Sequence, residues 1–180
     1  MIIDRMYVIQ EIIKKTRAKV YLEIGVREGE CFLRIKATKK IAVDPQMLIS
    51  PKKKRKFYFK NLSNIFNQYF ETTSDDFFKD NHKSLNSHGL DVVFIDGLHT
   101  YEQSLRDVQN ALKYLKDDGV IIMHDCNPLS EAAAYPAQSY QYAESLNIPG
   151  FTGEWNGDTW KTIVYLRSSR KDLDVFVLDC

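Results

Sequence analysis

The sequence predicts an α/β protein built on a doubly wound, mostly parallel sheet of seven strands, and two patterns carry this prediction. Short, mostly apolar segments alternate with segments whose apolar residues recur at helical spacing, as expected for parallel strands covered by helices on both faces. The last two apolar segments are separated by only a few residues, whereas a parallel crossover needs a dozen or more. We therefore expect the sheet to end in a C-terminal antiparallel β-hairpin.

The predicted strands are short apolar segments, most of which stop at a glycine or a polar side chain. Five are expected in the parallel part, at residues 19–24, 41–43, 69–73, 91–96 and 120–123. The two strands of the terminal hairpin are expected at residues 162–166 and 174–178. Their shortness and apolar character favour strands that are buried on both faces of the sheet.

The predicted helices are marked by apolar periodicity and by capping residues. Met6, Ile9 and Ile13 share one helical face and predict a leading helix within residues 1–18. Thr100 and Gln103 form a capping box ahead of a further apolar stripe. The expected helices cover residues 4–16, 28–36, the region near 75–85 with a cap at Ser74, the stretch from Thr100 to a stop at Gly119, and a region after Ser130.

Length and composition place the chain among globular proteins. We expect residues 1–180 to form a single domain, in which residues 45–66 are a variable loop segment. The 25 Lys and Arg residues nearly balance the 24 Asp and Glu residues, which excludes a strong overall field for binding a polyanion. No apolar run approaches the roughly 20 residues of a bilayer span, so we expect no membrane partner.

The cysteines indicate a reducing environment. Cys31, Cys126 and Cys180 are odd in number and widely spaced. They form neither a disulfide framework nor a CxxC metal pair, so a cytoplasmic location is expected.

Polar side chains or glycines follow each of the first five predicted strands, where an open parallel sheet binds its ligands. They are Glu23 and Gly25, Asp44, Ser74 and Asp75, Asp96, and His124 with Asp125.

The turn after the first strand favours a ligand that carries an amine. Gly25 lets the backbone approach a ligand closely, and Asp44, 19 residues later, stands about where a ribose-binding acid is expected. The dinucleotide fingerprint G-x-G-x-x-G is absent, and Glu23 would repel a pyrophosphate. A nicotinamide cofactor is therefore disfavoured. S-adenosylmethionine, with its ribose and its cationic amino-acid end, suits this pattern.

The chain resembles the class I S-adenosylmethionine-dependent methyltransferases, a resemblance that implies a Rossmann-like fold over roughly residues 19–166. The turn Glu23-x-Gly25-x-x-x-Gly29 and Asp44 match the first two motifs of that family, and Ser74-Asp75 looks like its adenine-edge motif. The stretches 94–102, 115–125 and 155–161 are similar to the subgroup of macrocin-type and rhamnosyl O-methyltransferases and cephalosporin-hydroxylase-like proteins.

The resemblance implies a role for each of these residues. For the cofactor it implies Glu23, Gly25, Val26 and Gly29 at the methionine part, Asp44 at the ribose, Ser74 and Asp75 at the adenine, and Asp96 beside them. Relatives often hold a divalent metal with acids after the fourth and fifth strands, which implies Asp96, His124 and Asp125 as ligands of Mg²⁺ or another divalent ion. The imidazole favours an ion softer than Mg²⁺. Asp96 and His99 are the expected catalytic residues, with His99 as general base on a hydroxyl group.

The predicted function is methylation of a hydroxyl group on a small-molecule acceptor. The resemblance alone suggests a sugar or a glycosylated metabolite, and a homo-oligomer is expected. One alternative is a nucleic-acid methyltransferase that uses the basic and aromatic segment Lys52–Phe59. It is disfavoured because the N/D-P-P-Y/F tetrapeptide is absent after the fourth strand. Another alternative is a cofactor-binding protein without catalysis.

Structural interpretations of the same residues also stay open. Ser74 and Asp75 fit a helix cap, and His99 fits a packing role at a helix start. His124 and Asp125 fit an internal hydrogen-bonded pair.

Overall fold

The computed structural model describes residues 4–178. Their contacts define two compact units. The first contains the chain up to Gly97 together with Asp107–Ile122, and the second contains Leu98–Arg106 together with the chain from Met123 onward. Cys180, considered above, lies outside the described residues. Over residues 4–178, no helix combines the length and the apolar character that crossing a membrane requires.

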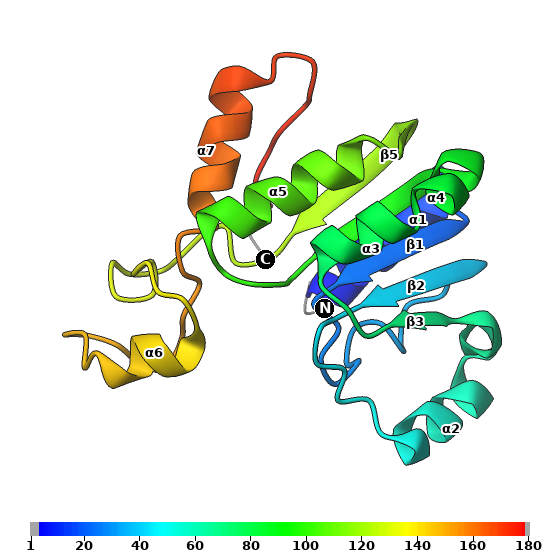
Figure 1. Cartoon of the computed structure of the whole chain (residues 1–180), viewed down its shortest axis with the longest axis horizontal. Helices are drawn as coiled ribbons and strands as arrows, with labels where there is room; N and C mark the ends of the chain where they lie inside the picture. The colour runs from blue at the N-terminus through cyan, green and yellow to red at the C-terminus, as the bar shows by residue number, and fades with distance from the viewer. Residues whose placement is uncertain (1–3, 179–180) are drawn as a thin grey trace. The chain divides into compact units, whose positions relative to one another are not determined.

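The first unit is organised around a five-stranded parallel sheet (Figure 1). Its strands are β1 (Val20–Ile24), β2 (Lys39–Val43), β3 (Gln68–Phe70), β4 (Leu90–Ile95) and β5 (Leu115–Met123). β1 pairs in parallel with β2 and with β4, and β2 pairs in parallel with β3. The spatial order β3-β2-β1-β4-β5 is that of a doubly wound, Rossmann-like sheet that reverses its winding between β1 and β4. This part of the predicted fold class is confirmed.

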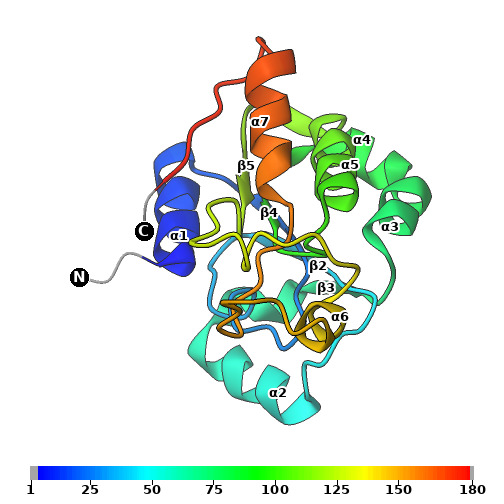
Figure 2. The ribbon, with the colours of Figure 1, turned by 90° about the vertical axis from the view of Figure 1, so that its left-hand side faces the viewer.

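Helices cover both faces of this sheet (Figures 1 and 2). α1 (Arg5–Thr16) lies on one face, and α3 (Ser74–Asp80) and α4 (His82–His88) lie on the other. α5 (Tyr101–Leu112) connects β4 to β5 and begins where the capping box predicts, because Thr100 Oγ1 accepts a hydrogen bond from the Gln103 amide at 3.4 Å.

α1 occupies the range of the expected leading helix. Asp4 caps it by accepting a hydrogen bond from the Tyr7 amide at 2.9 Å, and Arg17 ends it in a left-handed conformation. Ile9 and Ile13 are buried and join the apolar core of the first unit. The helix therefore forms because its apolar stripe has a sheet to cover.

The helix predicted near residues 75–85 is divided into α3 and α4 at Asn81. Thr73 is the N-cap of α3, since its hydroxyl accepts a hydrogen bond from the Asp76 amide at 3.1 Å. The expectation that Ser74 caps this helix is therefore wrong by one residue. Because Ser74 is not the cap, its side chain is available for another contact.

The helix predicted over residues 28–36 is wrong, because this segment forms successive turns. Its backbone carbonyl groups accept hydrogen bonds from side chains instead of from the backbone amides of a helix. Lys40 Nζ donates to the carbonyls of Phe32 and Ile35 at 2.7 and 2.9 Å, and Asn61 Nδ2 also donates to the Ile35 carbonyl at 2.9 Å. Buried tertiary hydrogen bonds thus outweigh the local apolar spacing.

Residues 45–66, expected as a loop, contain the helix α2 (Pro51–Lys60) and the short 3₁₀ helix η1 (Leu62–Phe66). The Ser50 hydroxyl caps α2 by accepting a hydrogen bond from the Lys53 amide at 3.2 Å, and a proline occupies the first turn. α2 buries none of its residues. Its sequence therefore lacks the apolar stripe by which periodicity reveals a helix.

The second unit has less regular structure. It contains the first residues of α5, then α6 (Tyr140–Ser145) and α7 (Trp160–Ser169). The helix expected after Ser130 begins only at Tyr140, since residues 131–134 form a turn.

The predicted C-terminal hairpin is wrong. Residues 162–166 lie inside α7, and residues 174–178 have no regular structure, so the described sheet has five strands rather than seven. Thr162 and Leu166 are buried and four residues apart, which is the repeat of a helical face. The β-branched residues near Thr162 favour a strand by propensity, and burial on one helical face overrides that preference.

Candidate functional site

The carboxyl ends of β1 and β4 meet at a contact that requires glycine. Gly25 follows β1 with a φ of +86°, and a Cβ atom there would lie 1.9 Å from Asp96 O. Its amide donates to Val43 O at 2.9 Å, and the Asp96 amide donates to Ile24 O at 2.9 Å. The ends of β1, β2 and β4 are thereby held together where the sheet reverses its winding, the place where open α/β sheets bind ligands.

Asp44 holds the turn that follows β1. Its Oδ2 accepts a hydrogen bond from the Arg27 amide and its Oδ1 accepts one from the Gln46 amide, both at 2.7 Å. Arg27 has a φ of +45°, which a non-glycine residue rarely adopts. In the same turn, Val26 is buried and Gly29 has a φ of +71°. A carboxylate has about four lone-pair sites, so Asp44 retains capacity for the hydroxyl groups of a ribose.

Glu23 is buried within β1, with 2% of its surface exposed. Its carboxylate accepts a hydrogen bond from the Tyr21 hydroxyl at 2.5 Å, and that hydroxyl lies 3.9 Å from Cys31 Sγ. Burial raises the pKa of Glu23 to about 7. The Tyr21 hydrogen bond opposes this shift, and the charge of Asp96 adds to it. Glu23 therefore changes its charge near neutral pH.

Lys40 is a second buried ionisable group of the first unit. Besides the carbonyls of Phe32 and Ile35, its ammonium group donates to Asn64 Oδ1 at 2.5 Å. Three donors thus meet three acceptors. Burial lowers the pKa of Lys40 to about 7, and the charge of Glu23 opposes this shift. The side chain fastens β2 to the 28–36 turns and to η1.

Asp96 pairs with a residue that the sequence analysis missed. Arg5 Nη1, on α1, lies 3.1 Å from Asp96 Oδ2, which follows β4. The Asp96 side chain is 18% exposed, so the guanidinium orients a carboxylate that still faces solvent. Only the apolar face of α1 gave a signal in the sequence, and no pattern singles out Arg5.

Ser74 and Asp75 both bind side chains of α5. Ser74 Oγ donates to Asp107 Oδ1 at 2.5 Å, and Asn110 Nδ2 donates to Asp75 Oδ1 at 3.2 Å. Ser74 and Asp107 are buried. These contacts fasten the start of α3 to α5, and the adenine-binding role of Ser74 and Asp75 stays a prediction.

The second unit gathers two other predicted residues, His99 and His124, and a third residue, Asn156, around Asp125. Asp125 Oδ2 lies 3.2 Å from His99 Nε2 and 3.0 Å from His124 Nδ1. Asn156 Nδ2 donates to Asp125 Oδ1 at 2.6 Å. These four residues are termed the imidazole–carboxylate cluster. Asn156 was not identified from the sequence as a site residue, although it stands in the stretch that resembles the methyltransferase subgroup.

Asp125 is held in its ionised form. Burial raises its pKa, but the contact and charge of His124, the charge of His99 and the Asn156 amide outweigh burial, so the pKa lies below its ordinary value. Asp125 also has a φ of +56°. A left-handed non-glycine residue costs about 1–3 kcal/mol and is found disproportionately at active sites.

His99 faces acceptors at both ring nitrogens. Its Nδ1 lies 3.0 Å from Trp155 O, while its Nε2 faces Asp125. The His99 and Trp155 rings lie 5.4 Å apart, and Trp155 Nε1 donates to Tyr135 O at 2.8 Å. Both ring nitrogens of His99 thus face an oxygen atom, and the contact at Nε2 helps to position the Asp125 carboxylate.

Residues 155–158 fasten the chain around His99. Gly157 has a φ of +60°, and a Cβ atom there would lie 1.9 Å from His99 O, so only glycine allows this approach. Asp158 Oδ1 accepts a hydrogen bond from the Tyr101 amide at 2.5 Å at the start of α5. The segment thus holds the chain that carries His99 on both sides of that residue.

The predicted metal ligands belong to different units, Asp96 to the first and His124 with Asp125 to the second. In the second unit, a carboxylate and imidazole nitrogens form a donor set for a divalent ion softer than Mg²⁺. Metal binding stays a prediction.

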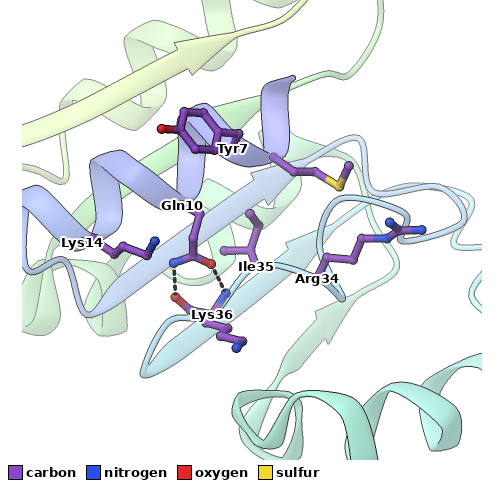
Figure 3. A pocket seen from close by; sticks show the side chains of 7 residues that line it. Tyr7, Gln10, Lys14, Arg34, Ile35 and Lys36 are labelled. Carbon is purple, nitrogen blue, oxygen red and sulfur yellow. Dashed lines mark hydrogen bonds between the residues drawn. The ribbon is translucent and has the colours of Figure 1, made fainter. Parts of the chain in front are cut away.

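A hollow of about 430 Å³ lies between α1 and residues 34–36 of the first unit (Figure 3). Gln10 forms part of its wall, donating to Lys36 O at 3.1 Å and accepting from the Lys36 amide at 2.8 Å. None of the predicted site residues lines this hollow, so it is not assigned to the site.

Comparison with known proteins identifies the family. A family model of a methyltransferase domain matches residues 22–126, more than half of the chain. A search of curated proteins gives no match. The matched range runs from β1 to just beyond Asp125, and thus includes the first four strand ends and the His124–Asp125 pair. A methyltransferase domain implies the use of S-adenosylmethionine. The chain belongs to the methyltransferase-domain family.

Proposed function

We propose that this methyltransferase transfers the methyl group of S-adenosylmethionine to a hydroxyl group of a small molecule. The observation that carries the proposal is the pair of His124 and Asp125, an imidazole beside a carboxylate whose pKa is lowered. A hydroxyl oxygen is a weak nucleophile until a base removes its proton or a cation coordinates it. An acceptor hydroxyl therefore explains why a base stands after β5.

His124 is the base in this proposal. Asp125 Oδ2 lies 3.0 Å from His124 Nδ1, and an ionised carboxylate there favours the tautomer with its proton on Nδ1. The basic nitrogen is then Nε2. S-adenosylmethionine, when bound, supplies a methyl group attached to a positively charged sulfur. As the acceptor oxygen bonds to the methyl carbon, the electron pair of the C–S bond stays on sulfur and His124 Nε2 takes the hydroxyl proton.

His99, the base expected from the sequence, becomes a positioning residue. Both of its ring nitrogens face acceptors in the second unit, Trp155 O and Asp125. Its role, together with Asn156, is to hold the Asp125 carboxylate in one orientation and in its ionised form. Asp96, also expected to be catalytic, is oriented by Arg5 and is proposed to lie beside the cofactor.

For the cofactor, the proposal keeps the roles that the resemblance implies. The Glu23 carboxylate would bind the methionine amine, and the turn of Gly25, Val26 and Gly29 would pass close to it. Asp44 supports a ribose site because its carboxylate stands at the end of β2 and retains lone pairs. The adenine is assigned to Ser74 and Asp75.

A divalent metal is the competing explanation for the His124–Asp125 pair. When bound, the ion would be held by these two residues of the second unit and would make the acceptor hydroxyl more acidic. The two explanations exclude each other at His124, because a nitrogen that binds a metal through its lone pair does not accept a proton. Treatment with a chelator separates them: turnover that survives chelation supports His124 as the base.

The decisive experiment combines cofactor binding with turnover. Calorimetry with S-adenosylhomocysteine should show micromolar binding, and labelled methyl transfer to a panel of hydroxyl compounds, sugars included, should identify acceptors. His124→Gln should lower turnover about 100-fold and leave S-adenosylhomocysteine affinity unchanged. His88→Gln, an exposed histidine on α4, is the matched control and should retain turnover.

Two outcomes would replace the proposal. Binding of S-adenosylhomocysteine without turnover on any acceptor would favour a cofactor-binding protein without catalysis. Turnover on nucleic acid, with binding that weakens steeply as salt rises, would favour a nucleic-acid methyltransferase.

A further inference from the structure

The first unit presents an unusually cationic helix that is not used by the proposed chemistry. α2 contains six Lys and Arg residues and no acidic residue. Two of these cations have partners within the unit, since Lys53 pairs with Glu30 and Lys54 Nζ lies 3.8 Å from the centre of the Tyr69 ring. Within residues 4–178, the other four form no ion pair; they are Lys52, Arg55, Lys56 and Lys60.

Large apolar side chains are exposed in the same stretch of the chain as these cations. Phe59 is 85% exposed at the end of α2, and in η1 Leu62 is 71%, Ile65 56% and Phe66 76% exposed. Figure 1 shows α2 beyond the edge strand β3 of the sheet. α2 rests on the first unit through half-buried side chains, among them Phe57 against the apolar core, and none of its residues is fully buried. The exposed cations and apolar side chains of α2 and η1 are therefore available to an external partner.

We propose that the α2–η1 segment (residues 51–66) docks on the surface of an anionic lipid bilayer. The four cations would lie at the negatively charged headgroups, and the four exposed apolar side chains would enter the boundary between headgroups and acyl chains. This inference goes beyond methyl transfer, and it differs from the expectation of no membrane partner, which rested on the length of the apolar runs.

Charge and side-chain type favour a lipid surface over other partners. Protein interfaces are depleted in lysine, whereas α2 carries five lysines. Two copies of the segment facing each other would bring their cations together and repel. A nucleic acid would use the cations and stack its bases on Phe59 and Phe66, but it would leave the branched side chains of Leu62 and Ile65 exposed to water. An anionic bilayer uses both the charges and the apolar groups.

Flotation of the full chain with lipid vesicles tests the proposal. The chain should float with vesicles of equal parts phosphatidylcholine and phosphatidylserine and should stay unbound with phosphatidylcholine alone. Replacing Lys52, Arg55 and Lys56 with Gln should lower the partition coefficient by about fivefold per charge. Phe59→Ser with Phe66→Ser should also abolish flotation, and because both side chains are exposed the fold should persist.

Matched controls and competing outcomes make the test decisive. Gln at Lys15, Lys79 and Lys83, three exposed lysines outside the segment, removes the same charge and should leave flotation unchanged. Equal binding to neutral and anionic vesicles, or an equal loss in both sets of Gln variants, would overturn the proposal. So would a dimer that the Phe59→Ser, Phe66→Ser variant dissociates in sedimentation, or oligonucleotide binding by the segment without flotation.

Discussion

The two units shift the pKa of a carboxylate that is withdrawn from water in opposite directions. Glu23 of the first unit accepts a hydrogen bond from the neutral Tyr21 hydroxyl, and burial raises its pKa to about 7. Asp125 of the second unit is also withdrawn from water, yet two imidazoles and an amide bring its pKa below the ordinary value. Burial alone therefore does not fix the charge of a carboxylate. The donors around it decide which protonation state is favoured.

The two units also differ in how they hold their backbone. The first unit is fixed by the many hydrogen bonds of a parallel sheet whose central strand is wholly buried. The second has no sheet of its own among its described residues and depends on single contacts, such as the approach of Gly157 to His99. Disturbing one contact should therefore matter more locally in the second unit, and the following predictions test this difference.

Gly157→Ala should have the largest effect, a loss of about 4 kcal/mol in the free energy of unfolding. Its Cβ would meet His99 O at 1.9 Å in a backbone conformation that already disfavours alanine. Gly150 is a matched control, with a φ of +79° and no atom within 4 Å of the added Cβ. Gly150→Ala should lose only about 1 kcal/mol. Equal losses in chemical denaturation would show that the His99 contact is dispensable.

Lys40→Met should destabilise the first unit by about 3 kcal/mol. The methionine removes three buried hydrogen bonds, each worth about 1 kcal/mol. The Ile35 carbonyl keeps Asn61 as a donor and Asn64 Oδ1 keeps Asn67, so the loss falls most heavily on the Phe32 carbonyl. Lys39→Met, at the half-exposed neighbouring position, should stay within about 0.5 kcal/mol of the unchanged protein. Urea denaturation measures both variants, and a Lys40→Met protein as stable as the original would contradict the structural role of this ammonium group.

Asp125→Asn should lower turnover about 100-fold and leave S-adenosylhomocysteine affinity unchanged. An asparagine amide can donate to His124 Nδ1, which places the imidazole proton on Nε2 and removes the basic nitrogen. Steady-state kinetics with any acceptor found in the panel would measure the effect. Asp172→Asn, an exposed acid, controls for the loss of charge. Full activity in Asp125→Asn would remove the pair from the mechanism.

The affinity for S-adenosylhomocysteine should rise about tenfold between about pH 6 and about pH 8. The pKa of Glu23 is raised to about 7, so the carboxylate is mostly neutral below that pH and mostly ionised above it. A cationic amine binds the ionised form. Tyr21 and Cys31 keep their protons in this interval because burial raises both pKa values, whereas Lys40 also titrates near 7.

Glu23→Gln separates these contributions in calorimetry. It should abolish the rise with pH, because glutamine cannot ionise, although Lys40 remains and still titrates in this variant. A rise that persists in Glu23→Gln would assign the dependence to another group, and a flat profile in the original protein would place the amine away from Glu23.

The sequence by itself determined the elements that are marked by an apolar pattern or by capping residues within a short segment. The apolar segments at β1, β2 and β4, the amphipathic α1 and the capping box of α5 each carry their signal within a few residues. Because parallel strands end on one edge, the order of strands and helices also placed Gly25, Asp44 and Asp96 together. The close approach of Gly25 to Asp96 O agrees with that expectation.

Only the tertiary structure decided the features that depend on distant partners. The 28–36 segment forms turns because Lys40 and Asn61 take its carbonyls, and residues 162–166 form a helix because Thr162 and Leu166 are buried on one face. The pairing of Arg5 with Asp96 and the approach of Asn156 to Asp125 join residues 91 and 31 positions apart. Local propensity contains no information on such pairs, because their free energy arises only once the chain has folded.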